Sequence, residues 1–479
     1  MTDIGITSIG VHVPAARLER RVIAEAHAWA FPGLKSEGKG EKAFCNWDED
    51  VITMAVAAAR NCVAAADRGA ISELVLASTT APFADLGNAA IVSTAIALGQ
   101  DVPTRDIGGT VRAGTSALID ALRTAREDVL VIASDVPGAA PASLDELRSG
   151  CAAVAIRTGT GPLLARHLAS VSRTRPFVDH FRRAGRDHDY GWEERWVRDV
   201  GFAQIAAGTV RDALEQAGKA GSDVKFLVAG SKVSGAERTL AKAAGLTNAQ
   251  FVDKPQGMCG HAGTAASLLQ LALVLEEAEP GDLIVVVSFG YGCDVIVLEA
   301  SAGVTSLRTT APASTALARR HPEPAYLRYL TYTGAIRPDF GMRSEFDPKS
   351  SLTQVYRSSD QLNAFVAGQC ADCGTVQFPV LPACVKCAST AEKKPHPLAD
   401  ESATMVTFTA DHLSFHLSPP LYMGLAQFDS GARVFMEVVD IAPGTDVAVG
   451  MPVRMVFRRK DVDATRGYIR YFWKAATLD

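Results

Sequence analysis

Two stretches of this chain repeat the same order of loop, apolar helix, acidic turn and buried strand. The first begins at Gly114 with GTSALIDALRTAREDVLVIASD, and the second begins at Gly263 with GTAASLLQLALVLEEAEPGDLIVVVSFG. Two shorter strings, ELVLAS from Glu73 and KFLVAGS from Lys225, recur at nearly the same spacing of about 150 residues. Because two independent pairs of similar segments recur at nearly the same spacing, the sequence predicts a duplicated α/β domain whose halves pack pseudo-symmetrically. The alternative is chance recurrence of Ala-rich helices and Val-rich strands, which any α/β protein contains.

The secondary structure expected up to about Ala300 fits this duplication. Short β-branched runs alternate with amphipathic stretches, a pattern typical of a sheet with buried parallel strands. The expected strands are Glu73–Ser78, Asp128–Ser134, Lys225–Ser231 and Leu283–Phe289, and the expected helices include Val51–Ala66 and Ala206–Ala217. The 479 residues leave room for two or three domains in all.

The texture of the sequence changes after Ala300. Residues from Ser301 to Pro324 are rich in Thr, Ala, Pro and Arg, which predicts a linker or a connection along the surface. Beyond residue 400, short alternating segments separated by Pro, Gly and Asp turns predict a small β barrel. These segments are Thr404–Ala410, Arg433–Val439, Val453–Phe457 and Tyr468–Trp473.

Four of the nine cysteines lie within eighteen residues, as Cys370, Cys373, Cys384 and Cys387. Each CxxC folds into a tight turn that directs two thiolates to one point, and four thiolates complete a tetrahedral zinc site. Because four sulfurs leave no position open for water, we expect a structural zinc. Iron in a rubredoxin-like site has the same ligands, so the spacing does not choose the metal. Two unrelated pairs, or one redox CxxC, are the alternative.

Composition excludes several classes of protein. The net charge of −5 and the pI near 6.1 argue against nucleic-acid binding, which usually needs a basic face. No apolar run approaches the roughly 18 to 20 residues that span a bilayer, and MTDIGITSIG lacks the basic and apolar regions of a signal peptide. We therefore expect a cytoplasmic protein that binds neither nucleic acid nor membranes.

Several strings resemble the thiolase superfamily, specifically HMG-CoA synthases and ketoacyl-ACP synthase III. They are NWDEDVITMAVAAAR from Asn46, DIGGTVRAGTSAL from Asp106, SGCAAVAI from Ser149, GHAGTAAS from Gly260 and GDLIVVVSFGYGCD from Gly281. Residues from about Leu362, including CADCGTVQFPVLPACVKC, GMPVRMVFRRK and YFWKA, resemble the rubredoxin-like zinc ribbon and OB-fold domain that accompanies archaeal thiolases and HMG-CoA synthases.

The resemblance implies an α/β fold of five αβαβα layers, followed by a small zinc ribbon and an all-β OB-fold barrel. The implied domains are a thiolase-like body at 1–304, a linker and connecting helix at 305–345, the zinc ribbon at 346–395 and the OB-fold at 396–479. It also implies an acyl-CoA thioester as ligand, with coenzyme A as part of the substrate. A homodimer is implied as well, and association with a thiolase or another acyl-CoA-processing partner is the further expectation.

The positions that match the family's catalytic residues depart from its pattern. The acyl-accepting Cys of the family falls at Val111, its Glu general acid/base at Thr79, and its His at Ala229 or Gly230. Valine cannot form an acyl-enzyme, so we do not expect the family's covalent chemistry at this position. We expect Thr79, Val111 and Gly263 to line the substrate site instead.

Two further residues are the expected catalytic groups. His261, in GHAG, stands where synthases have Asn and degradative thiolases have His, so its Nε2–H is expected to hold the thioester oxygen. Tyr291, on the closing loop, is expected to act as acid or base toward a β-hydroxyl. The alternatives are a satisfied core histidine and a tyrosine that only packs against the tunnel.

These residues favour aldol-type carbon–carbon bond cleavage or formation on a β-hydroxyacyl-CoA, by a lyase or transferase that forms no cysteine acyl-enzyme. One alternative is a non-catalytic, degenerate synthase-like subunit that pairs with an active thiolase or synthase. A second is Claisen-type acyl transfer by an unorthodox nucleophile such as Cys293.

Overall fold

The computed structural model describes residues 3–252, 254–345, 348–349 and 351–478. These residues form two compact units. The first consists of Met1–Asn46, Asp50–Ala90 and Leu98–Ile336, and the second of Trp47–Glu49, Ile91–Ala97 and Arg337–Asp479.

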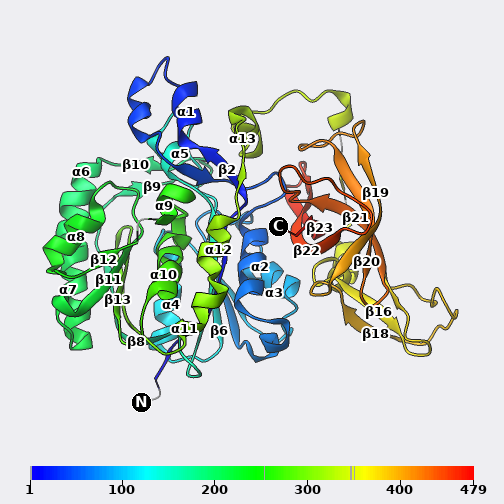
Figure 1. The fold of residues 1–479 in the computed structure, drawn as a ribbon, viewed down its shortest axis with the longest axis horizontal. Helices are drawn as coiled ribbons and strands as arrows, with labels where there is room; N and C mark the ends of the chain where they lie inside the picture. The colour runs from blue at the N-terminus through cyan, green and yellow to red at the C-terminus, as the bar shows by residue number, and fades with distance from the viewer. Residues whose placement is uncertain (1–2, 253, 346–347, 350, 479) are drawn as a thin grey trace. The chain divides into compact units, whose positions relative to one another are not determined.

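A ten-stranded sheet runs through the first unit (Figure 1). One half contains, in order, β5 (Thr104–Ile107), β4 (Glu73–Ala77), β6 (Val129–Asp135), β7 (Ala152–Gly159) and β1 (Gly5–His12). The other half contains the matching β12 (Gln250–Phe251), β11 (Val224–Ala229), β13 (Leu283–Phe289), β14 (Gly292–Ala300) and β8 (Ala165–Thr174). In each half the first three strands are parallel and the last two pairings antiparallel. The identical order and sense confirm the duplication expected from the repeats.

Helices complete the layers of this fold. α2 (Val51–Cys62) packs on β1, β6 and β7, and its counterpart α7 (Ala207–Ala217) packs on β8 and β14. α4 (Ala113–Arg123) and α10 (Ala266–Glu277) contact each other and strands of both halves. Every residue from Ala266 to Glu276 is buried, as a helix packed between the two halves of the sheet requires. The result is the expected five-layer αβαβα arrangement.

The four expected strands form within two residues of their predicted ends. The predicted helix from Val51 stops at Cys62, and its start is fixed by a capping box. There the Asp50 carboxylate accepts from the Thr53 N–H at 3.0 Å, and the Thr53 hydroxyl accepts from the Asp50 N–H at 2.8 Å. The other predicted helix is extended at its start, because Val197–Ala206 forms a π-helix that runs into α7.

The prediction of a linker after Ala300 was wrong for its first part. Val304–Thr310 and Pro312–Ala318 form α11 and α12, which pack on α10. Their apolar residues are few but lie at helical spacing, and Val304, Leu307, Ala313 and Leu317 are all buried. The Glu276 carboxylate also accepts from the Ala313 N–H at 2.6 Å, which caps α12. The domain boundaries themselves stay predictions.

Smaller elements surround the sheet. They are α1 (Arg20–Ala26), α3 (Asn88–Ala95), α5 (Leu144–Arg148), α6 (Glu194–Trp196), α8 (Ala236–Ala244), α9 (Lys254–Met258), α13 (Tyr326–Tyr332), the sheet of β15 (His321–Pro322), β2 (Ala16–Glu19) and β3 (Glu41–Ala43), and the hairpin of β9 (His180–Phe181) and β10 (Tyr190–Gly191).

The second unit contains two β structures, preceded by α14 (Leu352–Arg357) and α15 (Ser359–Leu362). A small sheet is formed by β17 (Val376–Gln377), β16 (Val366–Cys370) and β18 (Lys393–Pro397). A closed barrel is formed by β19 (Ala403–Asp411), β20 (Leu421–Phe428), β21 (Arg433–Val439), β23 (Tyr468–Thr477) and β22 (Pro452–Asp463). The barrel was expected, but β20 was not, since it follows two prolines and contains Gly424. Within the described residues, no helix is long and apolar enough to cross a membrane.

Candidate functional site

Asp135, at the end of β6, organises one side of the candidate site. It is fully buried. Its Oδ1 accepts hydrogen bonds from the Ser78 hydroxyl at 2.8 Å, the Thr79 N–H at 2.8 Å and the Thr80 hydroxyl at 2.9 Å. Its Oδ2 accepts from the Thr79 hydroxyl at 3.0 Å and the Thr264 N–H at 2.8 Å. The carboxylate therefore joins the loop after β4 to the loop before α10.

Gly263 lies against the same carboxylate. A Cβ atom at this position would lie 2.3 Å from Asp135 Oδ2, and the glycine has a φ of +54°. Both facts exclude a side chain here, since the backbone must approach Asp135 closely in a left-handed conformation. Two expected site residues, Thr79 and Gly263, are thus brought together by an aspartate that sequence reasoning did not single out.

His261 is buried two residues before this glycine. Its backbone forms a bridge with Ser149, and its N–H donates to the Arg148 carbonyl at 2.7 Å. The Gly263 N–H donates to Nδ1 at 3.3 Å, which places the proton of the neutral ring on Nε2. Burial, followed by the nearby charge of Lys232, lowers the pKa of His261 to about 3, although a hydrogen bond to the Gly230 backbone opposes the shift. His261 is therefore a neutral hydrogen-bond donor at pH 7 and a weak base.

Of the two positions that match the family's His, Ala229 and Gly230, the second is closed to a side chain in this fold. A Cβ atom at Gly230 would lie 2.8 Å from the Ser267 backbone nitrogen and 3.0 Å from its hydroxyl. A larger side chain would have to displace the start of α10.

Val111 lies on the other side of the site, just before α4. It faces the turn between β13 and β14, where a Cβ on Gly290 would lie 2.7 Å from Val111 Cγ2. Arg112 fixes this arrangement, since its Nε donates to the Gly290 carbonyl at 2.8 Å and its Nη1 donates to the buried Asp294 at 2.6 Å. No thiol stands at this helix start, where a helix dipole would activate one.

Tyr291 follows Gly290 in that turn. Its side chain is half exposed, its φ is +48°, and its N–H donates to Asp179 Oδ1 at 3.1 Å. Cys293 is fully buried in β14, and burial raises the pKa of its thiol far above the ordinary range. A thiol of this kind stays protonated, which disfavours Cys293 as a nucleophile.

The segment from Asp179 to Asp189 reaches both sides of the site. Asp179 holds the backbone of Tyr291, while Arg182 donates to the Thr79 carbonyl and to Asp189. His180 lies close enough to His261 for its charge to contribute to the lowered pKa of that ring. Sequence reasoning passed over this segment, although its run of charged and imidazole groups, DHFRRAGRDHD, was a visible signal.

A cavity of about 360 Å³ opens beside His261. Its basic side chains outnumber its acidic ones: Arg20, Arg148, Lys232 and Arg238 against Glu37 and Glu237. Some of this charge is already paired, since Lys232 contacts Asp145 at 2.8 Å and Arg148 contacts Glu37 at 2.7 Å. Arg148 also pairs with Glu194, so the carboxylates in and around the cavity equal its basic side chains in number.

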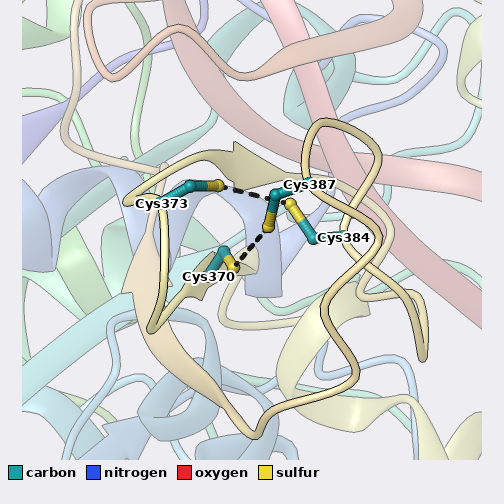
Figure 2. Close-up of side chains that lie close together, drawn as sticks. All are labelled: Cys370, Cys373, Cys384 and Cys387. Atoms are coloured by element: carbon teal, nitrogen blue, oxygen red, sulfur yellow. Dashed lines mark hydrogen bonds between the residues drawn. The ribbon is translucent and has the colours of Figure 1, made fainter.

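The four clustered cysteines meet in the second unit as a metal-binding group. Their Sγ atoms all lie within 4.8 Å of one another, with Cys370 and Cys387 at 3.7 Å and Cys373 and Cys384 at 3.5 Å (Figure 2). Zn–S bonds of about 2.3 Å in a tetrahedron require sulfurs roughly 3.8 Å apart, so the group fits zinc. Hydrogen bonding by Thr375 lowers the pKa of Cys373 to about 6, which favours the thiolate that a metal needs.

Comparison with family models agrees with this description of the second unit. Residues 360–392 match the model described as ChsH2, rubredoxin-like zinc ribbon domain, and residues 396–458 match the ChsH2, C-terminal OB-fold domain. The ribbon match supports a structural zinc rather than leaving the metal open.

Curated relatives match the first unit. The hydroxymethylglutaryl-CoA synthase of Methanocella arvoryzae is 27% identical over 350 residues, which covers 70% of this chain and 99% of the relative. That of Thermococcus sibiricus is 26% identical over 343 residues, covering 69% and 96%.

Solved structures agree on the fold. An HMG synthase of the curacin biosynthetic pathway, in complex with acetyl donor-ACP, superposes with a TM-score of 0.61 at 18% identity, covering 75% of this chain and 94% of that one. PksG, an HMG-CoA synthase from Bacillus subtilis, superposes with a TM-score of 0.59 at 18% identity, covering 72% and 95%. The chain therefore has a thiolase/HMG-CoA synthase-like N-terminal domain, followed by ChsH2-type zinc ribbon and OB-fold domains.

Proposed function

We propose that this protein makes or breaks a carbon–carbon bond in a CoA thioester by aldol chemistry, without a cysteine acyl-enzyme. The observation that carries the proposal is the contrast between Val111 and His261. Val111, two residues before α4, offers no nucleophile, while the loop before α10 holds a buried imidazole that stays neutral. Relatives named hydroxymethylglutaryl-CoA synthases support an acyl-CoA substrate, and in this proposal the arginine and lysine side chains of the cavity beside His261 bind the phosphates of coenzyme A.

A retro-aldol cleavage needs only groups that this site offers. A base removes the proton of a β-hydroxyl, the oxygen's electron pair forms a carbonyl, and the electrons of the broken bond form the thioester enolate. A proton returned to the α-carbon yields the shorter acyl-CoA, so no oxidant or acyl transfer is required. In this proposal Nε2–H of His261 leaves its hydrogen bond with the Gly230 backbone and donates to the enolate oxygen instead. Because the ring is neutral, it stabilises the enolate as a hydrogen-bond donor without transferring a proton.

In this proposal Gly263 and Val111 form the space around the thioester, while Thr79 and Tyr291 have other roles. Gly263 lets the loop approach closely, and Val111 lines the space that a nucleophile would occupy. Thr79 has both its N–H and its hydroxyl bonded to Asp135, so it shapes the site rather than transferring protons. Tyr291 is half exposed on the closing turn, and in this proposal it contacts the substrate.

The test is incubation of the purified full-length protein with a panel of β-hydroxyacyl-CoAs, with detection of the released ketone or aldehyde. We expect cleavage of at least one substrate, and loss of turnover in His261→Ala with the circular dichroism spectrum unchanged. The absence of cleavage in the wild type would refute the proposal.

Mass spectrometry after exposure to acetyl-CoA tests the non-covalent part. The wild type is expected to remain unmodified. Val111→Cys supplies a positive control, since it restores a thiol at the start of α4, where the helix dipole and backbone amides favour a thiolate. A stable acyl adduct on any cysteine of the wild type would contradict the non-covalent mechanism.

A second candidate is a non-catalytic subunit that pairs with an active thiolase or synthase. It is favoured by the closed position at Gly230 and by the full engagement of Thr79 with Asp135. In this case the isolated protein is inactive toward the whole panel but changes the rate of a co-purifying enzyme. His261→Ala would then leave that effect unchanged.

A further inference from the structure

His180 and Asp179 form an imidazole–carboxylate pair at the start of the hairpin of β9 and β10. Nδ1 of His180 lies 2.5 Å from Asp179 Oδ2, and both side chains are largely buried, at 21% and 12% exposed. The backbone holds the pair in place, because His180 pairs with Gly191 and the Trp192 N–H donates to the Asp179 carbonyl at 3.0 Å.

The pair lies where the parts of the candidate site converge. The other oxygen of Asp179 accepts from the Tyr291 N–H, and Arg182, two residues beyond His180, bonds the Thr79 carbonyl. Lys232, which lines the cavity together with His261, acts electrostatically on both imidazoles. Two hydrogen bonds thus tie this hairpin to the loops that carry Thr79 and Tyr291, and the charge of His180 acts on His261.

The orientation of the pair leaves one nitrogen of His180 for chemistry. A carboxylate on Nδ1 fixes that nitrogen as the donor, so the lone pair of the neutral ring is on Nε2. Within the part of the chain that the structure describes, no hydrogen bond is found on Nε2 of His180. This is the arrangement of an oriented general base.

The two imidazoles have opposite protonation behaviour. Burial and the charge of Lys232 lower the pKa of His180, but the hydrogen bond and charge of Asp179, with a contribution from Asp189, outweigh them, and the pKa is raised overall. The pKa of His261 is lowered to about 3. Neighbouring groups with pKa values pushed apart are typical of a base and a neutral hydrogen-bond donor in one site.

We propose that His180, oriented by Asp179, is the proton-transfer residue of this site. The role rests on the proposed aldol function. In cleavage, Nε2 of His180 takes the proton of the β-hydroxyl as the carbon–carbon bond breaks, and the electrons of that bond enter the enolate held by His261. The imidazolium then returns the proton to the α-carbon, which leaves the enzyme in its starting state. His180 thereby supplies the acid/base function that Thr79 cannot supply in place of the family's Glu.

The test compares His180→Gln and Asp179→Asn with His188→Gln in the full-length protein, using a β-hydroxyacyl-CoA that the wild type cleaves. His188 is an exposed histidine of the same segment and serves as the matched control. We expect His180→Gln to lower kcat by roughly 10²- to 10⁴-fold with KM nearly unchanged, and to abolish the fall in kcat/KM at acidic pH. Asp179→Asn keeps an acceptor for Tyr291 but turns an amide NH2 toward Nδ1 of His180, so the neutral ring carries its proton on Nε2 and kcat should also fall, by up to about 10⁴-fold. His188→Gln should match the wild type.

The outcomes separate this role from the proposed function. A wild type that cleaves substrate together with a His180→Gln variant that retains its rate overturns the role of His180 and leaves the aldol function intact. Loss of the rate in Tyr291→Phe but not in His180→Gln would transfer the role to the phenol. A wild type that cleaves nothing overturns the function and the role together. Circular dichroism of each variant identifies a loss of rate that comes from unfolding.

Discussion

The ion pair between Arg112 and Asp294 leads to a quantitative prediction for the first unit. The Arg112 side chain is 10% exposed and the Asp294 side chain 0%, and their closest atoms lie 2.6 Å apart. In Arg112→Met the carboxylate stays buried with only the hydroxyls of Thr115, Ser116 and Ser172 as partners. Breaking a buried pair by removing one member costs about 3–5 kcal/mol of unfolding free energy. The Gly290 carbonyl also loses its Nε donor but keeps the Thr110 hydroxyl, so we expect a loss near 4 kcal/mol.

Arg166→Met is the matched control. Arg166 also pairs with carboxylates, at 3.0 Å from Glu299 and 3.5 Å from Asp3, but its side chain is 38% exposed. Water screens this pair, so the same substitution should cost less than about 1 kcal/mol. Equilibrium urea denaturation followed by far-ultraviolet circular dichroism measures both losses. Equal losses in the two variants would refute the reasoning, because burial would then not govern the energy of the pair.

Three other predictions concern the site and the metal. Gly263→Ala should destabilise the protein more than Gly281→Ala in the same urea assay, since both glycines have positive φ but only the first would clash with Asp135. The wild type should lose stability relative to His261→Asn as the pH falls from about 6.5 toward 4, by up to about 1.4 kcal/mol per pH unit. Between these pH values the histidine of the unfolded chain binds a proton, whereas the buried ring of the folded protein, with its pKa of about 3, does not. Parallel plots of stability against pH for the two proteins would contradict this prediction. Ala388→Gly should strengthen zinc retention against a chelator, because Ala388 has a φ of +59° where the first CxxC turn has Gly374 at +72°; unchanged retention would show that this strain is absent.

The fold was predictable because it depends on local patterns. The buried strands are runs of Val, Ile and Leu that are too short for typical helices, so they predict strands. Their repeat at a constant spacing predicts the duplication. The zinc site was predictable for a related reason, since each CxxC turn is local and only two of them had to meet. The helices α11 and α12 were missed because four buried apolar residues among Thr, Ala and Pro give too weak a periodicity.

The site was only partly predictable, because its contacts join residues far apart in the chain. The sequence pointed to His261 and Gly263 but gave no sign that Asp135 binds both Thr79 and Thr264. The left-handed turn at Tyr291 and its bond to Asp179 likewise depend on how two loops meet. Burial of His261, which decides that the ring is neutral, follows from packing and not from its neighbours in the sequence.

In the proposed function, the residue at position 79 is coupled to the Asp135 network. The Thr79 hydroxyl lies 3.0 Å from Asp135 Oδ2, so a Glu at this position would place a second carboxylate beside a buried one. Two like charges about 4 Å apart repel by about 4 kcal/mol even at an effective dielectric constant of 20. A Glu carboxylate held that close to Asp135 would therefore be disfavoured in the Asp135 network. A thiol restored at Val111 would accept an acyl group but find no neighbouring Glu to carry the condensation forward, which is why we place the proton-transfer group on a different element, the hairpin that carries His180.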